Sequence, residues 1–436
     1  MIDIGTCKNV LIMGYGISGK SAYEFLKRQG ANLCVFDDAT DLELKDRVHN
    51  VDWGSVDLVV KSPSVPFMNH NCHPIVRGAI DHNVPVVSIF DVFNFYNPEA
   101  KIIAITGTDG KSTTSALACH ILKKAGISAQ LGGNIGVPYF DIPKAEWYIL
   151  EMSSYELASS QYLNFEIACV LNIEPDHLEF HGSLTNYIEA KHKALEHAKV
   201  RIISYEDKFT MAKYANQNNV MKISTEKVED ADVYAYEGAL RERHSQQLIL
   251  DLTGMPNLRG KHNHQNMEFA YAICKQLDIS SREILKNMHT FTPLPHRIHI
   301  VKKVKNILFV NDSKATSPNA AAKALATFVG YKIYWLVGGR SKGIDPIPYI
   351  KPYIAEIQKI YLFGESMDEF ELIFKKMKEI ARCHSMSTAV NSAFIDAKKE
   401  TGPAVILLSP MCASFDQFEN FEHRGNEFEK IVQKIK

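Results

Sequence analysis

Short apolar segments that run into glycine-rich turns constrain the fold of this chain more than any other feature of its sequence. The segments "NVLIMGYG" and "KIIAITGTDG" each lead into a stretch that we expect to be helical. Four more segments follow after residue 300, namely "ILFVNDSKAT", "IYWLVGGRSKG", "IYLFGES" and "AVILLSPMCAS". Strands that alternate with helices predict mostly parallel sheets covered on both faces. We therefore expect an α/β protein whose ligands bind at these turns, where the strands end.

Two proline-containing stretches divide the chain. The stretch "FYNPEA" precedes the second strand-and-turn block, and "TFTPLPHRIHIV" precedes the third. A length of 436 residues suits about three domains of ~150 residues each. We place these domains at 1–97, 98–297 and 298–436. The first and third are expected to be Rossmann-like, and the central one to be a P-loop ATPase-like α/β domain.

The composition limits the partners of the protein. A formal net charge of −1 argues against broad attraction to nucleic acid or to an anionic membrane. The eight cysteines are scattered without a CxxC pair, so neither a zinc ribbon nor a disulfide framework is expected. Apolar runs stay well short of the ~20 residues that span a bilayer. We expect a soluble, cytoplasmic monomer that acts on small molecules.

The segment "AITGTDGKSTTSAL" indicates a phosphate site. Unpaired N–H groups at a helix N-terminus bind phosphate, and Gly107 and Gly110 let the backbone fold closely around its oxygens. Lys111 can reach the β- and γ-phosphates, and the hydroxyl of Ser112 or Thr113 can bind Mg²⁺. The match to a Walker A motif is partial, because isoleucine replaces its first glycine. The alternative is an ordinary glycine turn with a surface lysine.

Three residues further along are candidates for a metal site. Glu151 ends the apolar strand of "YILEMSS", where a carboxylate can face either a metal ion or water. His177 lies among acids in "NIEPDHLEFHG", although a lone histidine is more often structural. Lys191 falls in the apolar stripe of "TNYIEAKHKALEHAKV". A lysine there either extends its amine to water or lies where the neutral amine is favoured.

Taken together, these motifs resemble those of the Mur ligase family, whose members join amino acids to UDP-linked muramic acid. The loop "TGTDGKST" is similar to the family's P-loop, with Asp109 where asparagine is common. "GGNIG", "LEMSS", "DH" and "AK" occur in the family's order. The resemblance implies ATP, two Mg²⁺ ions and carbamoylation of Lys191 by CO₂. The implied metal residues are Ser112, Glu151, His177 and Lys191, and the implied catalytic residues are Lys111, Glu151, His177 and Lys191.

The resemblance extends to nucleotide contacts beyond the phosphate loop. "GKHNHQN" is similar to a nucleotide-contacting segment of the family, "PLPHR" supplies an arginine, and "NDSKAT" supplies an aspartate at a strand end. By themselves these segments are compatible with a polar helix start and a capped turn. The implied ATP-binding residues are Gly107, Thr108, Asp109, Gly110, Lys111, Ser112, Thr113, Asn266, Arg297 and Asp312.

The C-terminal segment points to one branch of the family. "LLSPMCASFDQFENFEHRGNEF" resembles the signature of the branch that uses D-glutamate, and the DNPR-type motif of the diaminoacid branch is not found. Three phenylalanines of this segment have helical spacing, so core packing is the alternative role for Phe415, Phe418 and Phe421. The implied acceptor residues are Lys314, Thr316, Lys342, Ser414, Phe415 and Phe421.

The first glycine turn, "GYGISG", has two interpretations. Taken alone, it predicts a dinucleotide site with Asp37 on a ribose hydroxyl, as in an NAD-dependent dehydrogenase. Under the resemblance, it holds the diphosphate of the UDP-sugar donor. Asp38, Ser64 and Glu156 depart from the family pattern in this region. The implied donor residues are Ile17, Ser18, Asp37, Asp38, Asn134, Ser153 and His177.

We therefore expect an ATP-dependent amide ligase that joins D-glutamate to UDP-N-acetylmuramoyl-L-alanine through an acyl phosphate. A sister ligase with another acceptor is the main alternative, since one or two contacts could change the amino acid. A dehydrogenase leaves the Lys111 loop and Lys191 unexplained. A non-catalytic nucleotide-binding protein would bind ATP without turnover.

Overall fold

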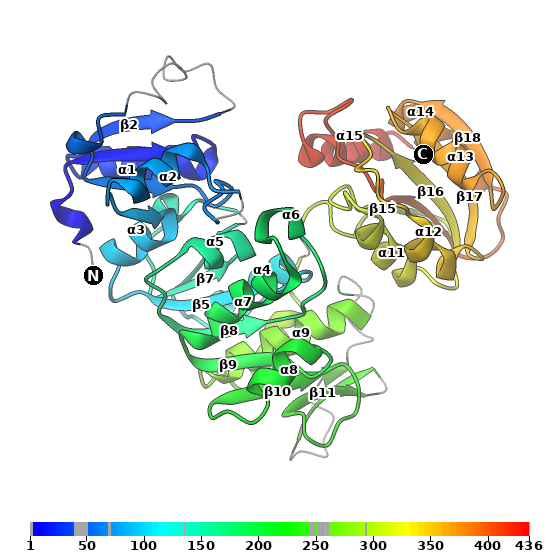
Figure 1. Ribbon diagram of the computed structural model, residues 1–436. Helices are drawn as coiled ribbons and strands as arrows, with labels where there is room; N and C mark the ends of the chain where they lie inside the picture. The colour runs from blue at the N-terminus through cyan, green and yellow to red at the C-terminus, as the bar shows by residue number, and fades with distance from the viewer. Residues whose placement is uncertain are drawn as a thin grey trace. The chain divides into compact units, whose positions relative to one another are not determined.

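The computed structural model describes residues 3–435 apart from 39–50, 69–70, 135, 237, 244–249, 252–257, 259–260 and 293. These described residues form three sheets, of four, nine and six strands, with helices between them (Figure 1). The chain divides into two compact units, Met1–Gly254 with Asn263–Phe291, and Met255–His262 with Thr292–Lys436. The prediction of three α/β domains is confirmed. The boundaries placed at residues 97 and 297 stay predictions.

The four-stranded sheet begins the first unit and is parallel throughout, in the order β2-β1-β3-β4. At its first turn, Gly14 has a φ of +86°, and a Cβ on Gly19 would lie 1.9 Å from the Gly14 carbonyl oxygen. Only glycines allow helix α1 to begin so close to β1. The elements are β1 (Asn9–Met13), α1 (Ile17–Arg28), β2 (Asn32–Phe36), β3 (Leu58–Lys61), α2 (Pro74–Asp81), β4 (Val86–Ser88) and α3 (Ile89–Tyr96).

The nine-stranded sheet has the order β13-β12-β11-β10-β9-β8-β5-β7-β6. Strands β5 to β11 are parallel, whereas β12 and β13 add an antiparallel edge that was not predicted from the sequence. The strands are β5 (Lys101–Thr106), β6 (Ala129–Gly133), β7 (Trp147–Glu151), β8 (Phe165–Val170), β9 (Ala198–Ser204), β10 (Val220–Ser224), β11 (Val233–Tyr236), β12 (Ala239–Glu242) and β13 (Leu250–Asp251).

Helices position the polar residues at the strand ends of this sheet. Helix α4 packs on β6 and β7, and α7 packs on β8. Gly126 follows the last turn of α4 with a φ of +82°, a conformation that favours glycine at a helix end. The helices are α4 (Lys111–Lys124), α5 (Ser154–Ser159), α6 (Leu178–His181), α7 (Leu184–Glu196), α8 (Lys208–Tyr214), α9 (Lys261–Lys275) and α10 (Ser281–Met288).

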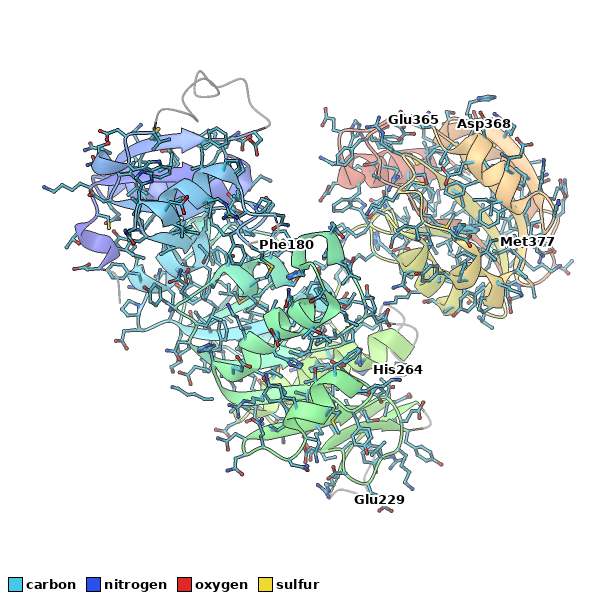
Figure 2. All side chains as sticks on the ribbon, viewed as in Figure 1. Phe180, Glu229, His264, Glu365, Asp368 and Met377 are labelled. Atoms are coloured by element: carbon cyan, nitrogen blue, oxygen red, sulfur yellow. The ribbon has the colours of Figure 1, made fainter. Side chains whose placement is uncertain are left out.

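Polar contacts join the two sheets of the first unit. The Asp91 carboxylate accepts hydrogen bonds from the backbone N–H groups of Gln161 and Tyr162, at 2.9 and 2.8 Å. Asn71 Nδ2 donates to the carbonyl of Phe180, which lies on α6 (Figure 2). The donor and catalytic regions predicted from the sequence are therefore parts of one compact unit.

The second unit contains the six-stranded sheet, in the order β14-β15-β19-β16-β17-β18. Only β14 is antiparallel to its neighbour. Strands β15, β16, β17 and β19 confirm the four predicted strand-and-turn segments, while β14 and β18 are additional. The elements are β14 (His299–Val304), β15 (Ile307–Asn311), α11 (Pro318–Thr327), β16 (Lys332–Gly338), α12 (Ile347–Ile350), β17 (Ile357–Phe363), α13 (Met367–Phe374), β18 (Glu379–His384), α14 (Met386–Ala397), β19 (Ala404–Leu408) and α15 (Phe421–Gln433).

Across the part of the chain that the structure describes, every helix is too short or too polar to cross a bilayer.

Candidate active site

The predicted phosphate loop connects β5 to the N-terminus of α4. Gly107 and Gly110 both have positive φ angles, of +155° and +84°. A Cβ on Gly110 would lie 2.4 Å from Asn266 Oδ1, so a larger residue would displace that side chain. The loop therefore has the strand–turn–helix geometry that exposes helix N–H groups to a phosphate.

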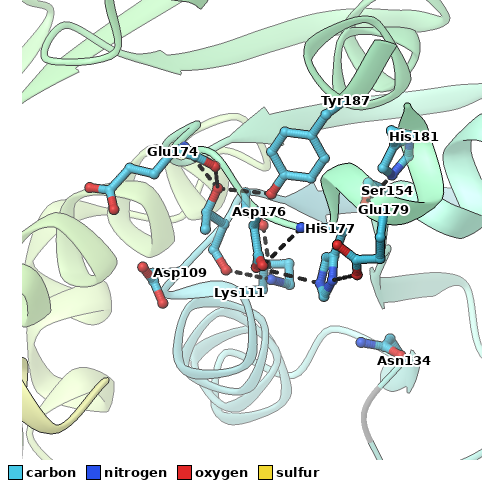
Figure 3. A network of polar contacts seen from close by, with 12 residues as sticks. Asp109, Lys111, Asn134, Ser154, Glu174, Asp176, His177, Glu179, His181 and Tyr187 are labelled. Atoms are coloured by element: carbon cyan, nitrogen blue, oxygen red, sulfur yellow. Dashed lines mark hydrogen bonds and ion pairs between the residues drawn. The ribbon is translucent and has the colours of Figure 1, made fainter. Parts of the chain in front are cut away.

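Two residues that the sequence analysis does not single out hold this loop in shape. The Asn172 carbonyl and Oδ1 accept hydrogen bonds from the N–H groups of Thr108 and Asp109, at 2.9 and 2.8 Å. The hydroxyl of Tyr187 lies 2.9 Å from Thr108 Oγ1. Asp109 is thus fixed through its backbone, and its carboxylate lies on the side of the loop away from His177 (Figure 3). Asn172 and Tyr187 belong to the segments quoted for His177 and Lys191, but their contacts with the loop were not predicted, because only folding brings them to it.

Lys111 is folded back over the loop. Its Nζ donates to the carbonyl oxygens of Gly107 and Thr108, both at 2.8 Å. Ser112 is buried at the start of α4, and Thr113 is half-buried beside it. The lysine ammonium therefore already lies against the turn where a phosphate chain would bind.

Asn266 contacts the helix that follows the loop. Its Oδ1 accepts a hydrogen bond of 3.1 Å from Thr114 Oγ1, and its Nδ2 donates to Asn263 Oδ1 at 3.0 Å. The residue is 3% exposed and lies in the first half of α9. The structure thus brings together two predicted nucleotide segments that are more than 150 residues apart.

Lys191 is buried directly behind the loop. Its Nζ donates to the Gly107 carbonyl at 2.8 Å and lies 4.8 Å from the centre of the Tyr187 ring. Burial, followed by the nearby positive charge of Lys111, holds the pKa of Lys191 well below its usual value. Of the two interpretations of this lysine, the structure favours the buried amine over one that extends to water.

Glu151 ends β7 with one oxygen unsatisfied. Its Oε1 accepts a hydrogen bond of 3.3 Å from Asn134 Nδ2. Its Oε2 is buried and has no hydrogen-bond partner within the described part of the chain. Because leaving a buried carboxylate oxygen without a partner costs free energy, this atom is suited to bind a cation.

His177 occupies a strained position at the start of α6. Its φ is +52°, and its ring nitrogens lie 3.4 Å from an Asp176 oxygen and 3.8 Å from a Glu179 oxygen (Figure 3). The side chain is 41% exposed, so it can reach a ligand. Among the described residues, no three or more histidine, cysteine, aspartate or glutamate side chains gather as a metal site. A metal ion bound here would need at least one ligand that is not a histidine, cysteine, aspartate or glutamate side chain.

The predicted donor residues fall into two sets along the chain, one within residues 17–38 and the other within residues 134–177. Ile17 is 78% exposed in the first turn of α1, and Ser18 follows it. The Asp37 carboxylate accepts a hydrogen bond from the Tyr15 N–H, so it braces the glycine turn. Asp38 lies 3.4 Å from His73 Nε2.

The Ser153 side chain forms hydrogen bonds at the start of its own helix. It caps α5, accepting from the Glu156 N–H at 3.2 Å and donating to Glu156 Oε2 at 3.1 Å. Glu156 also accepts a 2.8 Å hydrogen bond from the hydroxyl of Tyr139. Burial raises the pKa of Glu156. The departure from the family pattern at Glu156 therefore affects the start of helix α5 rather than a surface exposed to solvent.

The predicted acceptor residues all lie at the strand-end edge of the six-stranded sheet. Lys314 Nζ lies 3.8 Å from the centre of the Phe421 ring, a cation–π contact. Ser414 is buried, Thr316 is half-buried and Lys342 is exposed. These residues follow three different strands.

Core packing does not account for all three phenylalanines of the C-terminal segment. Helix α15 begins only at Phe421, so Phe415 and Phe418 precede it and do not share a helical face. Phe418 packs against the core, whereas Phe415 is 64% exposed. The helical-spacing alternative is therefore wrong for Phe415, because the chain between these residues is a series of turns.

Two predicted nucleotide residues belong to the second unit. Asp312 is buried and accepts hydrogen bonds from Ser409 Oγ at 2.7 Å and from the Ile298 N–H at 3.2 Å. Burial raises the pKa of Asp312 to about 7, and the charge of Arg297 opposes this shift. Arg297 is half-buried and directly precedes Ile298 in the sequence.

Comparisons with known proteins identify relatives of this chain. Residues 105–274 match the Mur ligase middle domain family. A UDP-N-acetylmuramoylalanine–D-glutamate ligase from Agrobacterium fabrum is 36% identical, covering 97% of this chain and 94% of that protein. The same-named ligase from Paramagnetospirillum magneticum is 33% identical, covering 98% of this chain and 96% of that protein.

Solved structures with low sequence identity share the fold. The UDP-N-acetylmuramate–alanine ligase of Thermotoga maritima superposes with a TM-score of 0.63 at 18% identity, covering 99% of this chain and 100% of that one. The MurF ligase of the same organism, solved with ADP, gives 0.62 at 16% identity and covers both chains completely. From the full-length identity to its relatives, the chain belongs to the UDP-N-acetylmuramoylalanine–D-glutamate ligase family.

Proposed function

We propose that this protein joins D-glutamate to UDP-N-acetylmuramoyl-L-alanine with consumption of ATP, a step in making peptidoglycan precursors. The observation that carries this function is the full-length identity to ligases of that name. The site supports ATP use, because a phosphate loop, a buried lysine and a carboxylate oxygen without a partner among the described residues lie at the ends of parallel strands. We also propose that it acts as a cytoplasmic monomer.

The chemistry needs ATP because a carboxylate is a poor acyl donor. An oxygen of the donor's L-alanine carboxylate attacks the γ-phosphorus, and the bond to the ADP oxygen breaks. The amine of D-glutamate then attacks the acyl carbon. The tetrahedral intermediate loses a proton from nitrogen and expels phosphate, which leaves the amide.

The residues at the loop match the demands of the first step. The N–H groups at the start of α4 face the phosphates, and Lys111 exchanges its carbonyl partners for phosphate oxygens. His177, exposed between two carboxylates, lies where it can hold the donor. These groups offset the charge that spreads over the transferring phosphoryl group.

The residues present also fit magnesium. We propose that Ser112, Glu151, His177 and carbamoylated Lys191 hold it, since Glu151 Oε2 is buried without a partner within the described chain. Carbamoylation requires a neutral amine, and burial lowers the pKa of Lys191. Bound Mg²⁺ would supply charge neutralisation at the phosphate oxygens.

Replacing Glu151 with glutamine should raise the Mg²⁺ concentration for half-maximal activity by roughly 10–100-fold. The amide keeps the shape and the contact to Asn134 but removes the negative charge that the metal needs. The measurement is a magnesium titration of phosphate release. Glu146→Gln is the matched control, because this exposed carboxylate pairs with Lys101 at the opposite end of strands β5 and β7. Equal titration curves for the two variants would contradict a metal role for Glu151.

The proposed function is tested by the choice of acceptor. The full-length protein is given ATP, Mg²⁺ and UDP-N-acetylmuramoyl-L-alanine with D-glutamate, L-glutamate, L-alanine, glycine or L-lysine, and phosphate release is recorded. Only D-glutamate is expected to give strong turnover, since a site built for two carboxylates rejects analogues that lack them. Stronger turnover with another amino acid would assign the protein to a sister ligase instead. ATP hydrolysis that no acceptor stimulates would contradict ligation.

A further inference from the structure

Arg424 is the most deeply buried cation of the second unit that the proposed mechanism does not use. It lies in the first turn of α15, and its side chain is 0% exposed. Removing a guanidinium from water costs free energy, so a fully buried one must gain compensating contacts. What those contacts hold together indicates why the charge is there.

The guanidinium forms hydrogen bonds to three chain segments. Nε donates to Ser313 Oγ at 2.9 Å, and Nη2 donates to the carbonyls of Ser313 and Cys412 at 2.8 and 3.0 Å. Nη1 donates to the carbonyl of Gly338 at 3.4 Å. Ser313 and Cys412 follow β15 and β19, and Gly338 is the last residue of β16; these three strands are neighbours in the sheet.

The same contacts reach the start of α15. Ser313 Oγ, which accepts from Arg424, donates in turn to the carbonyl of Phe421 at 2.9 Å. The backbone packs tightly around this point, since a Cβ on Gly339 would lie 2.2 Å from the Ala413 carbonyl oxygen and 3.1 Å from Nη1. A larger side chain at Gly339 would therefore force these segments apart.

Each bonded segment carries a predicted acceptor residue nearby. Lys314 follows Ser313 directly, Ser414 is two residues after Cys412, and Lys342 is four residues after Gly338. The loops after β16 and β19 are also paired with each other, because Arg340 and Ala413 exchange backbone hydrogen bonds of 2.8 and 3.1 Å. Arg340 itself forms an ion pair with the exposed carboxylate of Glu365.

We propose that Arg424 is a positioning residue for the acceptor amino acid, which sets the spacing of the segments bearing Lys314, Lys342, Ser414 and Phe421 without contacting the acceptor. This inference rests on the proposed function, because it assumes that these residues bind D-glutamate. The planar guanidinium suits the role, since its donors point to several sides at once. A lysine ammonium is a single point and cannot make all four bonds.

The test is Arg424→Lys in the full-length enzyme, with the initial rate measured against each substrate. The KM for D-glutamate is expected to rise at least ~10-fold, because small displacements of binding groups are costly. The KM values for ATP and for the donor should change less than ~3-fold, and high D-glutamate should restore most of kcat. Arg201→Lys is the matched control, because Arg201 also donates to backbone carbonyls, at 2.7 and 3.2 Å, but in the other unit.

A second readout separates positioning from loss of folding. Hydroxylamine attacks an acyl phosphate to give a hydroxamate and phosphate, and it needs no carboxylate-binding site. The Arg424 variant should form hydroxamate at close to the wild-type rate. An unchanged KM for D-glutamate would overturn the inference, and so would an equal loss of hydroxamate formation and ligation.

The result also separates this inference from the proposed function. If the wild-type enzyme does not use D-glutamate, the proposed function fails. If the wild-type enzyme does and the variant matches it, only the role of Arg424 fails. Should Arg424→Lys not fold, Ser313→Ala removes the hydroxyl link alone and should raise the same KM by ~3-fold or more. Wild-type kinetics in Ser313→Ala would then overturn the inference.

Discussion

Replacing Lys191 with alanine should lower kcat by at least ~10²–10³-fold, the largest effect expected for any residue of α7. The amine lies 2.8 Å from the Gly107 carbonyl and is buried beside the Tyr187 ring, so its removal leaves a gap directly behind the phosphate loop. If its carbamate serves as a carboxylate ligand, acetate or propionate at high concentration should restore part of the rate. The measurement is phosphate release at saturating substrates, with and without the added acid.

The control is Lys193→Ala, two residues along the same helix. Lys193 Nζ donates to the carbonyl of Ala158 at 2.8 Å and does not contact the loop. This variant should keep kcat within a few-fold of the wild type and should not respond to acetate. Near-normal activity of Lys191→Ala in the absence of acids would remove the carboxylate role of Lys191.

Carbamoylation adds a dependence on dissolved CO₂. Because burial lowers the pKa of Lys191, its neutral, reactive form extends to lower pH than for an ordinary lysine. Acidification below that pKa should protonate the amine and lose the modification. Enzyme kept in CO₂-free buffer should accordingly lose activity and regain it with bicarbonate, whereas Lys191→Ala should not respond.

Replacing Lys111 with alanine should lower kcat by roughly 10³-fold, because a cation at the transferring phosphoryl group stabilises its charge directly. Lys111 Nζ is held by two loop carbonyls, so the ammonium is already placed at the turn. The loss should appear both in ligation and in hydroxamate formation, since both need the acyl phosphate. Single-turnover ADP formation measures the step itself.

Lys123→Ala provides the matched control on the same helix. Lys123 lies in the last turn of α4 and its Nζ donates to Gln130 Oε1 at 2.9 Å. It should retain ADP formation near the wild-type rate. A Lys111→Ala enzyme with normal single-turnover kinetics would exclude phosphoryl-transfer catalysis by this lysine.

Local sequence patterns predicted the elements that bear the site. The glycines of the phosphate loop, the strand end at Glu151 and the place of Lys191 in the apolar stripe of its helix all follow from spacing within a few residues. Such features depend on the 2- and 3.6-residue periods of strand and helix, which the chain encodes locally. The strands β15, β16, β17 and β19 were predictable for the same reason.

Contacts between distant segments were decided only by the tertiary structure. Asn172, two residues after β8, and Tyr187 on α7 brace the phosphate loop. Glu151 Oε2 has no hydrogen-bond partner among the described residues, which only the folded chain reveals. The sequence by itself does not show that the Arg424 side chain is buried. The sheet order places β19 between β15 and β16, so the ends of three strands lie close enough to bind one guanidinium. Sheet order is set by long-range pairing, which local periodicity does not specify.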